Sequence, residues 1–252
     1  SKPKILVADI ETLPIKGNVW GLFDQNVGLN QVDEDWAMLS FATKWLGKSK
    51  VTYEDTRNAL TVRDDRDIVA HLCSLLDEAD IVVGHNFCRF DLRKLTARAI
   101  QHKLQPFRMP LVADTLEMAK GAGAFTSNKL EYLAKTLTKA PKSRHAKYPG
   151  FELWAGIMRG EEAAWDEMRA YNIQDIKANE AVYLALRPWA KRHPNVAQFY
   201  SDDKRRCPRC GSHKLHEHGT VKSNVSEYIQ YLCKGCGGYS RSRFTINSKE
   251  KR

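Results

Sequence analysis

Clustered acids are the first feature of this 252-residue sequence that suggests chemistry. Asp9 and Glu11 stand two residues apart after a short apolar run, in the only Asp-x-Glu of the chain. If that run is a β-strand, both carboxylates emerge on one face of its sheet. Asp91 follows another apolar run, where a helix is expected to begin. Tyr171 and Asp175 lie four residues apart in a long helical pattern and therefore share a helix face.

Acidic groups brought together in this way would favour a metal site. Clustered carboxylates repel one another and cost stability unless a cation compensates their charge. Their oxygens are the ligands that Mg²⁺ and Mn²⁺ prefer. Two such ions ~3.5–4 Å apart can activate a water and stabilise the leaving oxygen of an in-line displacement. Taken singly, each acid has a simpler interpretation, as the end of a strand, a helix cap or a solvated side chain.

Hydrophobic patterning predicts the elements that would carry these residues. Short apolar runs predict strands over 4–8, 19–23, 38–45, 51–53, 81–83 and 111–113. Helical spacing predicts helices over 64–79, 90–102, 128–137 and 161–191. Strands followed by alternating helices and strands are typical of a mixed α/β sheet with helices on its faces. We expect Pro194 to end the last helix.

Four of the six cysteines form two knuckles, Cys207-Pro-Arg-Cys210 and Cys233-Lys-Gly-Cys236, each followed by glycine. Two knuckles separated by 22 residues match the ligand set of a structural Cys₄ zinc site. Four thiolates leave no open coordination position, so the zinc would stabilise the fold rather than catalyse. Two disulfides are the alternative, which an intracellular compartment disfavours.

The net charge of +10 lies entirely in the C-terminal quarter of the chain. Residues 1–186 carry 25 basic and 25 acidic side chains, whereas residues 187–252 carry 15 and 5. Such asymmetry favours an anionic polymer as a partner, with nucleic acid the first candidate. Arg241 and Arg243 alternate with aromatic residues and can pair with phosphates while their neighbours stack on bases. The alternatives are a solvated basic tail and an ordinary last strand with a charged outer face.

Composition and charge divide the sequence into a globular domain over 1–192, a linker over 193–206 and a basic zinc ribbon over 207–245. With 42% hydrophobic residues the chain can bury a substantial core, which excludes global disorder. No apolar run approaches the ~20 residues that cross a bilayer. The run after Lys4 is too short for a secretory signal core. We therefore expect a soluble, cytoplasmic protein with no membrane partner.

Over roughly residues 4–190 the motifs resemble the DEDD superfamily of 3′→5′ exonucleases, which has the RNase H-like fold. The residues that match its three motifs are Asp9 and Glu11, Asn86-x₃-Phe90-Asp91, and Tyr171-x₃-Asp175. Tyrosine in the third motif is similar to the DEDDy branch. Asp114-Thr115 and the segment 128–134 also resemble the proofreading exonuclease domains of family B DNA polymerases. Stand-alone exonucleases of phages and prokaryotes share these features, whereas the appended Cys₄ ribbon departs from the pattern.

The resemblance implies an RNase H-like mixed sheet flanked by helices and a metal-dependent 3′→5′ exonuclease acting on single-stranded DNA. Two Mg²⁺ or Mn²⁺ ions would be bound. Asp9 would bridge both ions, and Glu11 and Asp175 would hold the ion on the side of the nucleophile. Asp91 would support the other ion. Tyr171 would orient the attacking water, because a phenol with an ordinary pKa of about 10 is a hydrogen-bonding group more readily than a base.

Weaker candidates for contact with the nucleic acid surround this set. Leu13 would wedge against the terminal base, and Asn86 and Phe90 would line the path of the strand. The ribbon, through Arg241 and Arg243, would bind nucleic acid or recruit a replication or recombination protein. Two other functions stay open: an RNase H-like endonuclease acting on hybrid or branched nucleic acid, and a non-catalytic nucleic-acid-binding module that recruits partners.

Overall fold

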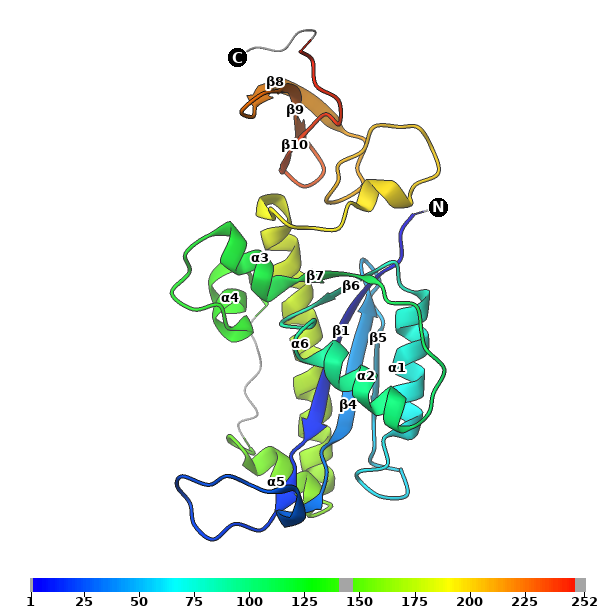
Figure 1. Cartoon of the computed structure of the whole chain (residues 1–252), viewed down its shortest axis with the longest axis vertical. Coiled ribbons are helices and arrows are strands. Elements are labelled where there is room, and N and C mark those ends of the chain that lie inside the picture. The colour runs from blue at the N-terminus through cyan, green and yellow to red at the C-terminus, as the bar shows by residue number, and fades with distance from the viewer. Residues whose placement is uncertain (1, 141–146, 248–252) are drawn as a thin grey trace.

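A five-stranded mixed sheet forms the centre of the larger part of the molecule (Figure 1). This computed structural model describes residues 2–140 and 147–247. The strand order is β5-β4-β1-β6-β7, with β1 paired antiparallel to β4 and parallel to β6. The strands are β1 (Ile5–Leu13), β4 (Ala37–Trp45), β5 (Val51–Asp55), β6 (Ile81–Gly84) and β7 (Leu111–Asp114). The predicted mixed α/β sheet is confirmed.

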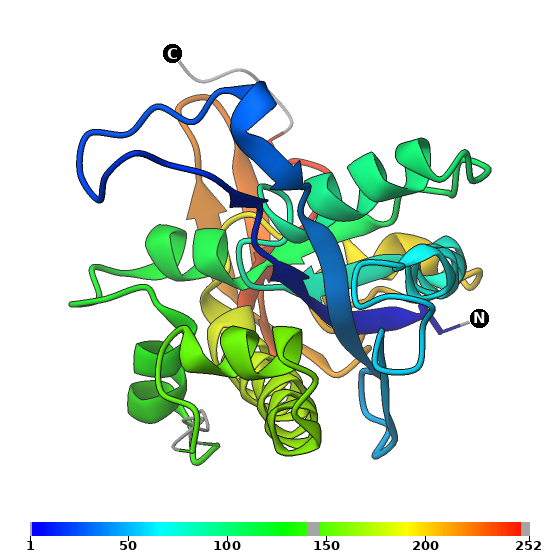
Figure 2. The ribbon, with the colours of Figure 1, turned by 90° about the horizontal axis from the view of Figure 1, so that it is seen from below.

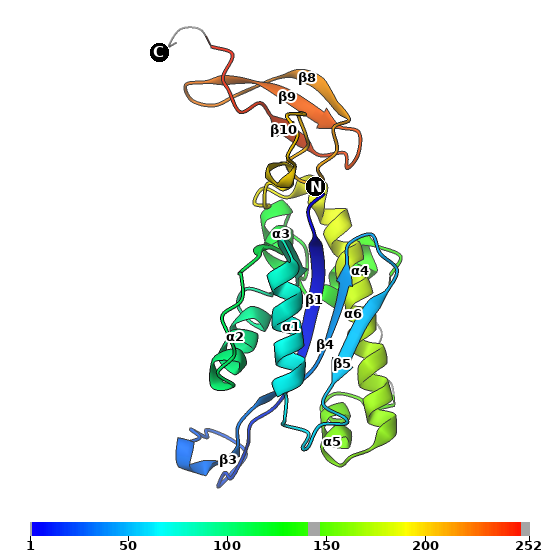
Figure 3. The same cartoon turned by 90° about the vertical axis from the view of Figure 1, so that its right-hand side faces the viewer.

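Helices cover both faces of this sheet (Figure 3). One face is covered by α1 (Arg66–Glu78) and α2 (Asp91–Gln101). The other face carries α3 (Thr115–Ala122), α4 (Leu130–Leu137) and the long α6 (Glu162–Leu186). A short α5 (Glu152–Met158) packs against the beginning of α6. The core is therefore divided into two apolar layers, one on each side of the sheet.

Side-chain alternation along β1 decides which layer each of its residues meets. Leu6, Ala8 and Ile10 are buried against α1 and α2. Ile5 and Val7 are buried with residues of α3, α4 and α6. Asp9 and Glu11 continue this second row, because side chains two apart on a strand share a face. The two carboxylates thus lie on the side of the sheet that α6 covers.

Residues 19–23, predicted as a strand, belong instead to an exposed loop. The loop joins two short paired strands, β2 (Lys16–Gly17) and β3 (Val32–Glu34), and includes a 3₁₀ turn, η1 (Leu29–Gln31). It projects from the rest of the chain in Figure 2, and Trp20 is 98% exposed. The strand prediction was wrong because an apolar run reports a buried strand only when another element covers it.

The long helix ends earlier than predicted. It stops at Leu186 and is followed by a 3₁₀ turn, η2 (Arg187–Trp189), that contains Pro188. A proline disfavours helical geometry at the preceding residue and lacks an N–H for the helical ladder. Pro188 therefore accounts for the end of the helix, and Pro194 does not. The helices α3 and α5 were not predicted, since both are short.

A second, three-stranded antiparallel sheet carries the C-terminal cysteines. Its strands are β8 (Leu215–Lys222), β9 (Glu227–Cys233) and β10 (Tyr239–Arg241), in the order β10-β9-β8. The connection from α6 contains a 3₁₀ turn, η3 (Val196–Phe199), and the Val196 N–H donates to the Pro208 carbonyl at 2.7 Å. We call the sheet and its cysteine knuckles the ribbon. No helix among the described residues is long and apolar enough to cross a membrane.

Asp65, at the start of α1, ties together three elements behind the sheet. Its buried carboxylate accepts hydrogen bonds from the Met38 N–H at 2.7 Å and from Nε and Nη2 of Arg98 at 2.7 and 2.6 Å. Nε2 of His102 lies 2.6 Å away. Burial alone would raise the pKa of Asp65, but these partners outweigh it and hold the pKa below its ordinary value. The cluster fixes α2, which begins with Asp91.

We expect Asp65→Ala to lower the free energy of unfolding by roughly 3 kcal/mol, because Arg98 would be left largely buried without its counter-charge. Urea denaturation measures the change. Asp64→Ala is the matched control, since Asp64 is less buried and lies outside the cluster, and should change stability by less than about 0.5 kcal/mol. Equal effects of the two substitutions would show that the Asp65 cluster does not stabilise the fold.

Candidate active site

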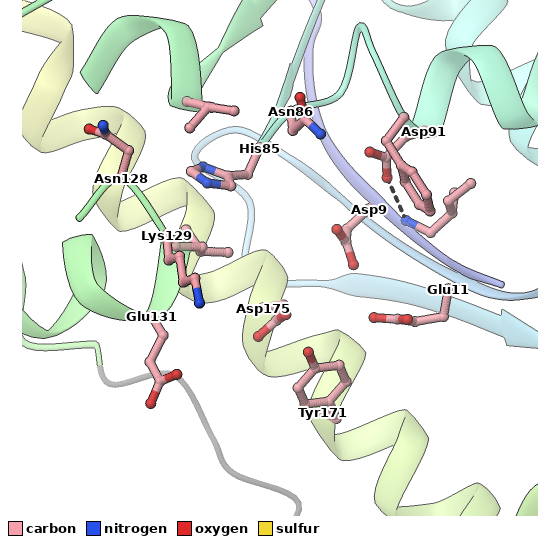
Figure 4. Close-up of a pocket in the computed structure, with 14 residues that line it drawn as sticks. Asp9, Glu11, His85, Asn86, Asp91, Asn128, Lys129, Glu131, Tyr171 and Asp175 are labelled. Atoms are coloured by element: carbon pink, nitrogen blue, oxygen red, sulfur yellow. Dashed lines mark hydrogen bonds between the residues drawn. The ribbon is translucent and has the colours of Figure 1, made fainter. Parts of the chain in front are cut away.

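Three of the four predicted metal-binding carboxylates converge where β1 meets α6 (Figure 4). Oxygens of Asp9, Glu11 and Asp175 all lie within 4.8 Å of one another. Asp175 is buried, whereas Asp9 and Glu11 are partly exposed. Hard oxygen donors at this spacing fit Mg²⁺ or Mn²⁺, and without a cation their charges repel. The cluster can therefore hold divalent metal.

Asp91 lies beside this cluster, on the α2 side of β1. Its Oδ1 accepts a hydrogen bond from the Ile10 N–H at 3.0 Å, shown as the dashed line in Figure 4. The pairing of β6 with β1 ends at Val7. Beyond that point the Asp91 carboxylate, and not a strand, accepts the hydrogen bond from the Ile10 N–H. The residue is 3% exposed, and burial is the main reason that the pKa of its carboxyl is raised to about 7. Bound cations would favour its ionised form.

A groove of about 570 Å³ connects these acids, and we call it the acidic groove. Tyr171 lies one helical turn before Asp175 and lines it, as do the predicted contacts Asn86 and Phe90. The residues that line the groove are Asp9, Ile10, Glu11, His85, Asn86, Phe90, Asp91, Leu116, Asn128, Lys129, Leu130, Glu131, Tyr171 and Asp175. All five residues of the motif set, four acids and a tyrosine, thus share one open groove.

Leu13 does not belong to the acidic groove. Its side chain is 0% exposed and packs in the core cluster that contains Leu153 and Trp165. Leu13 follows Asp9 and Glu11 on the side of the sheet that α6 covers, but residues of α5 and of the beginning of α6 pack over it and separate it from the groove. The prediction that Leu13 wedges against a terminal base is therefore wrong.

Asn172 is a residue of this site that the sequence analysis missed. Its Nδ2 donates to Oδ2 of Asp9 at 2.7 Å, and its Oδ1 accepts from the Ser40 hydroxyl at 3.1 Å. The side chain is fully buried. It holds one oxygen of Asp9 in place from the neighbouring helix. The sequence did contain a signal for this role. Asn172 lies midway between Met168 and Ile176 on the apolar face of α6, and a buried amide there needs hydrogen-bond partners.

Asp114, at the end of β7, shapes the loop that delivers the second motif. Its Oδ1 accepts from the N–H groups of Asn86 and Leu116 at 2.9 and 3.0 Å, and its Oδ2 accepts from the Cys88 N–H at 3.3 Å. Asn86 has a φ of 62°, in the left-handed region. The carboxylate thus stabilises an unusual turn directly before Phe90 and Asp91.

Lys129 brings a positive charge to the acidic groove. Among the described residues that line the groove it is the single lysine or arginine. The sequence pattern predicts one helix over residues 128–137, but α4 begins at Leu130. Lys129, the residue before the helix, has an extended backbone. Lys129 is exposed and can therefore offer its ammonium group to an anionic substrate.

The four ribbon cysteines form the second cluster of potential metal ligands found in the described part of the chain. Sγ of Cys207 lies 3.7 Å from that of Cys236, and Sγ of Cys210 lies 3.6 Å from that of Cys233. Tetrahedral zinc with Zn–S bonds of about 2.3 Å separates its sulfur atoms by about 3.8 Å. The four thiols converge on one centre, so the donor set fits zinc better than it fits two disulfides.

Each knuckle turns through the glycine that follows it. Gly211 and Gly237 have φ values of 74° and 79°. Their N–H groups donate to the carbonyls of Cys207 and Cys233 at 2.9 and 2.8 Å. A side chain would be strained in this left-handed conformation, which explains why glycine follows each knuckle. Arg241 lies on the same ribbon, at the end of β10.

Comparison with known proteins identifies the family. Residues 27–187, more than half of the chain, match the RNase_H superfamily, and the chain belongs to it. The matched region contains Asp91, Tyr171 and Asp175 and begins after Asp9 and Glu11. The mixed sheet with helices on both faces is thus the predicted RNase H-like fold. RNase H-like nucleases use divalent metals, which agrees with the acidic groove.

The fold is also similar to the family B DNA polymerase of the hyperthermophilic archaeon Pyrobaculum calidifontis, with a TM-score of 0.51 at 14% sequence identity. The match covers 74% of this chain but only 26% of the polymerase chain, so the protein matches about a quarter of that enzyme's length. No curated protein matches the sequence. Family and site together support a nucleic-acid-cleaving hydrolase.

With EDTA present, Asp91→Asn should be more stable than the unmodified protein at neutral pH. In the folded protein the pKa of Asp91 is about 7, above the ~3.9 of an unfolded chain. The stability due to the protonated carboxyl is complete below about pH 4 and is lost as the pH rises to about 7. The gap between the two proteins should grow over that window, to about 4 kcal/mol, and then level off. Urea titrations at a series of pH values measure it, and a pH-independent gap would contradict the assignment.

Zinc removal should unfold the ribbon and leave the larger domain folded. The ribbon buries few apolar side chains, so the metal is its main source of stability. Elemental analysis is expected to find one zinc per chain, lost in Cys236→Ser and retained in Cys88→Ser, which changes an exposed cysteine outside the cluster. Amide NMR spectra should show unfolding confined to the ribbon signals. Full zinc retention in Cys236→Ser would refute the Cys₄ site.

Proposed function

We propose that the protein is a metal-dependent 3′→5′ exonuclease that hydrolyses phosphodiester bonds of single-stranded DNA. The observation that carries the proposal is the approach of Asp9, Glu11 and Asp175 to within 4.8 Å of one another, in a groove also lined by Asp91 and Tyr171. The order of these residues in the sequence, and the tyrosine of the third motif, resemble DEDDy exonucleases. Membership of the RNase_H superfamily supports the same chemistry.

Each acid has a distinct part in this proposal. Two Mg²⁺ or Mn²⁺ ions bound by the acids would supply Lewis acidity for the attacking water and for the leaving 3′-oxygen. Asp9 would help to hold the ions, and Asn172 limits its rotation through the hydrogen bond to Oδ2. Glu11 and Asp175 would hold the ion that activates the attacking water. Asp91, fixed by the Ile10 N–H, would support the other ion.

The remaining groove residues position water and substrate. Tyr171 orients the attacking water by a hydrogen bond from or to its phenol. Lys129 neutralises a phosphate oxygen near the acids and so limits repulsion of the polyanion. Phe90 offers an exposed ring for stacking with a base, and Asn86 offers an amide from the same loop. The ribbon, with Arg241 and Arg243, aids nucleic-acid binding.

Digestion of a 5′-labelled single-stranded DNA oligonucleotide tests the proposal. With Mg²⁺ or Mn²⁺ the label should pass through a ladder of products that shorten from the 3′ end, and EDTA should abolish the reaction. Asp9→Ala should lower the rate at least about 100-fold because it removes a shared ligand. Tyr171→Phe should lower it by about 10- to 100-fold, with binding retained.

Two controls make the outcome decisive. Asp67→Ala removes an exposed acid from α1 and should leave the rate unchanged. A circular single-stranded substrate must stay intact, because an exonuclease needs an end; its cleavage would establish an endonuclease instead. Full activity in Asp9→Ala would falsify the site. Parallel digestion of RNA compares the two polymers, and faster cleavage of RNA would overturn the assignment of DNA as the substrate.

A further inference from the structure

A second groove lies between the ribbon and the connection that leads to it from α6. It has a volume of about 720 Å³, and none of the residues that line it lines the acidic groove. Its lining comes from the connection, from Leu215, Ile229 and Tyr231 on the strands of the ribbon, and from residues 240–246. We call it the ribbon groove. In Figure 1 the ribbon lies at the end of the molecule beyond the end of α6.

Tyr231, on β9, carries a buried and unpartnered hydroxyl in the lining of the ribbon groove. The residue is 2% exposed, and its Oη has no hydrogen-bond partner in the described part of the chain. The Arg205 guanidinium lies 4.7 Å from the centre of its ring. Leaving a buried hydroxyl without a partner costs about 1–3 kcal/mol. A ligand with acceptor oxygens, entering beside Arg205, would satisfy it.

Charge around the groove selects an anionic ligand. Five of the lining residues are cationic and one, Asp203, is acidic; the cationic ones are Lys204, Arg205, Arg206, Arg241 and Arg243. Arg206 is neutralised by Asp202, while Arg205 has only a loose contact with Glu217 at 3.8 Å. Arg241 and Arg243 have no carboxylate within 4 Å among the described residues. Within the described ranges, Arg241 and Arg243 therefore line the groove without a paired carboxylate.

Aromatic rings at the groove favour nucleic acid over an acidic protein segment. Phe244, which lines the groove, is 76% exposed. The Arg241 guanidinium lies 3.7 Å from the centre of the Tyr228 ring, which holds it in place and leaves N–H groups for hydrogen bonding. Exposed rings beside arginines are the combination that binds single strands, since bases stack on the rings while phosphates pair with the cations.

We propose that the ribbon groove binds a backbone phosphate of the nucleic-acid strand, with the Tyr231 hydroxyl as donor and Arg205, Arg241 and Arg243 as counter-charges. The inference rests on the proposed function. It locates a nucleic-acid-binding site in the groove that the connection and the ribbon form together. The acidic groove and the ribbon groove lie on different parts of the molecule. Only a strand long enough to reach both would engage them together.

Binding of a fluorescein-labelled oligo(dT) of ~30 nucleotides by the Asp9→Ala protein, followed by anisotropy at several salt concentrations, tests the proposal. Changing Arg205, Arg241 and Arg243 to Gln should weaken binding about tenfold or more. It should also flatten the salt dependence by about 0.7 for each phosphate that the protein no longer neutralises. Tyr231→Phe should weaken binding about three- to tenfold with the same salt slope, because a neutral hydroxyl releases no counterion.

Matched controls separate this inference from the function it rests on. Lys48→Gln, at the exposed β4–β5 turn, should change neither affinity nor slope. Zinc content must be retained in every variant, which shows that the ribbon is folded. Cleavage is compared in proteins that keep Asp9. There, cleavage of a ~4-nucleotide substrate should be the same in Tyr231→Phe as in the unmodified protein, whereas cleavage of a long substrate should slow at low concentration.

Each outcome has a defined meaning. Unchanged affinity and slope in the Tyr231 and arginine variants, with cleavage intact, would overturn the ribbon groove and leave the exonuclease standing. Weakened binding in these variants, with no cleavage by the unmodified protein, would support the groove and overturn the proposed function. Displacement of the oligonucleotide by poly-glutamate at equal charge concentration would identify an acidic protein segment as the ligand instead of nucleic acid.

Discussion

Electrostatic repulsion between carboxylates is the constraint on which the arrangement of this molecule depends. Asp9, Glu11 and Asp175 lie within 4.8 Å of one another, and in the absence of cations such groups push apart. The fold resists this because β1 is paired with β4 at Asp9 and Glu11 and α6 packs along the sheet beside it. Asn172 and the Ile10 N–H then fix individual carboxyl groups. The surrounding fold therefore holds the carboxylates together although their own interaction is unfavourable.

The two parts of the chain differ in net charge. A groove lined by acids does not attract a polyanion, and Lys129 is the one lysine or arginine seen along its described lining. The surplus of cations lies in the last quarter of the sequence, where 15 basic residues face 5 acidic ones. In the proposed function the ribbon raises the local concentration of the strand, and the acidic groove cuts it. In this proposal the ribbon attracts the strand, and hydrolysis takes place at the acidic groove on a different part of the surface.

Sequence patterns predicted the features that repeat along the chain and missed those that depend on contacts between distant segments. Alternation and helical spacing placed Asp9, Asp91 and Tyr171 on the elements that carry them, and the cysteine spacing predicted the Cys₄ cluster. Leu13 was misplaced because it is buried by residues of α5 and α6, which lie about 140 to 155 positions later in the chain. The hydrogen bond of Asn172 to Asp9 joins residues 163 positions apart, so neither local pattern contains it.

The small core of the ribbon links the molecule to the supply of metal in its surroundings. Tyr231, Cys207 and Cys233 are the buried hydrophobic residues recorded in the described part of the ribbon, so zinc takes the place of a core there. The acidic groove, by contrast, belongs to a domain with two apolar layers and needs only hard cations. In the proposed function, scarcity of zinc would therefore weaken binding of the nucleic acid while leaving the domain that carries the acidic groove folded. In that function, lack of zinc would impair binding of the strand, whereas lack of Mg²⁺ or Mn²⁺ would impair hydrolysis.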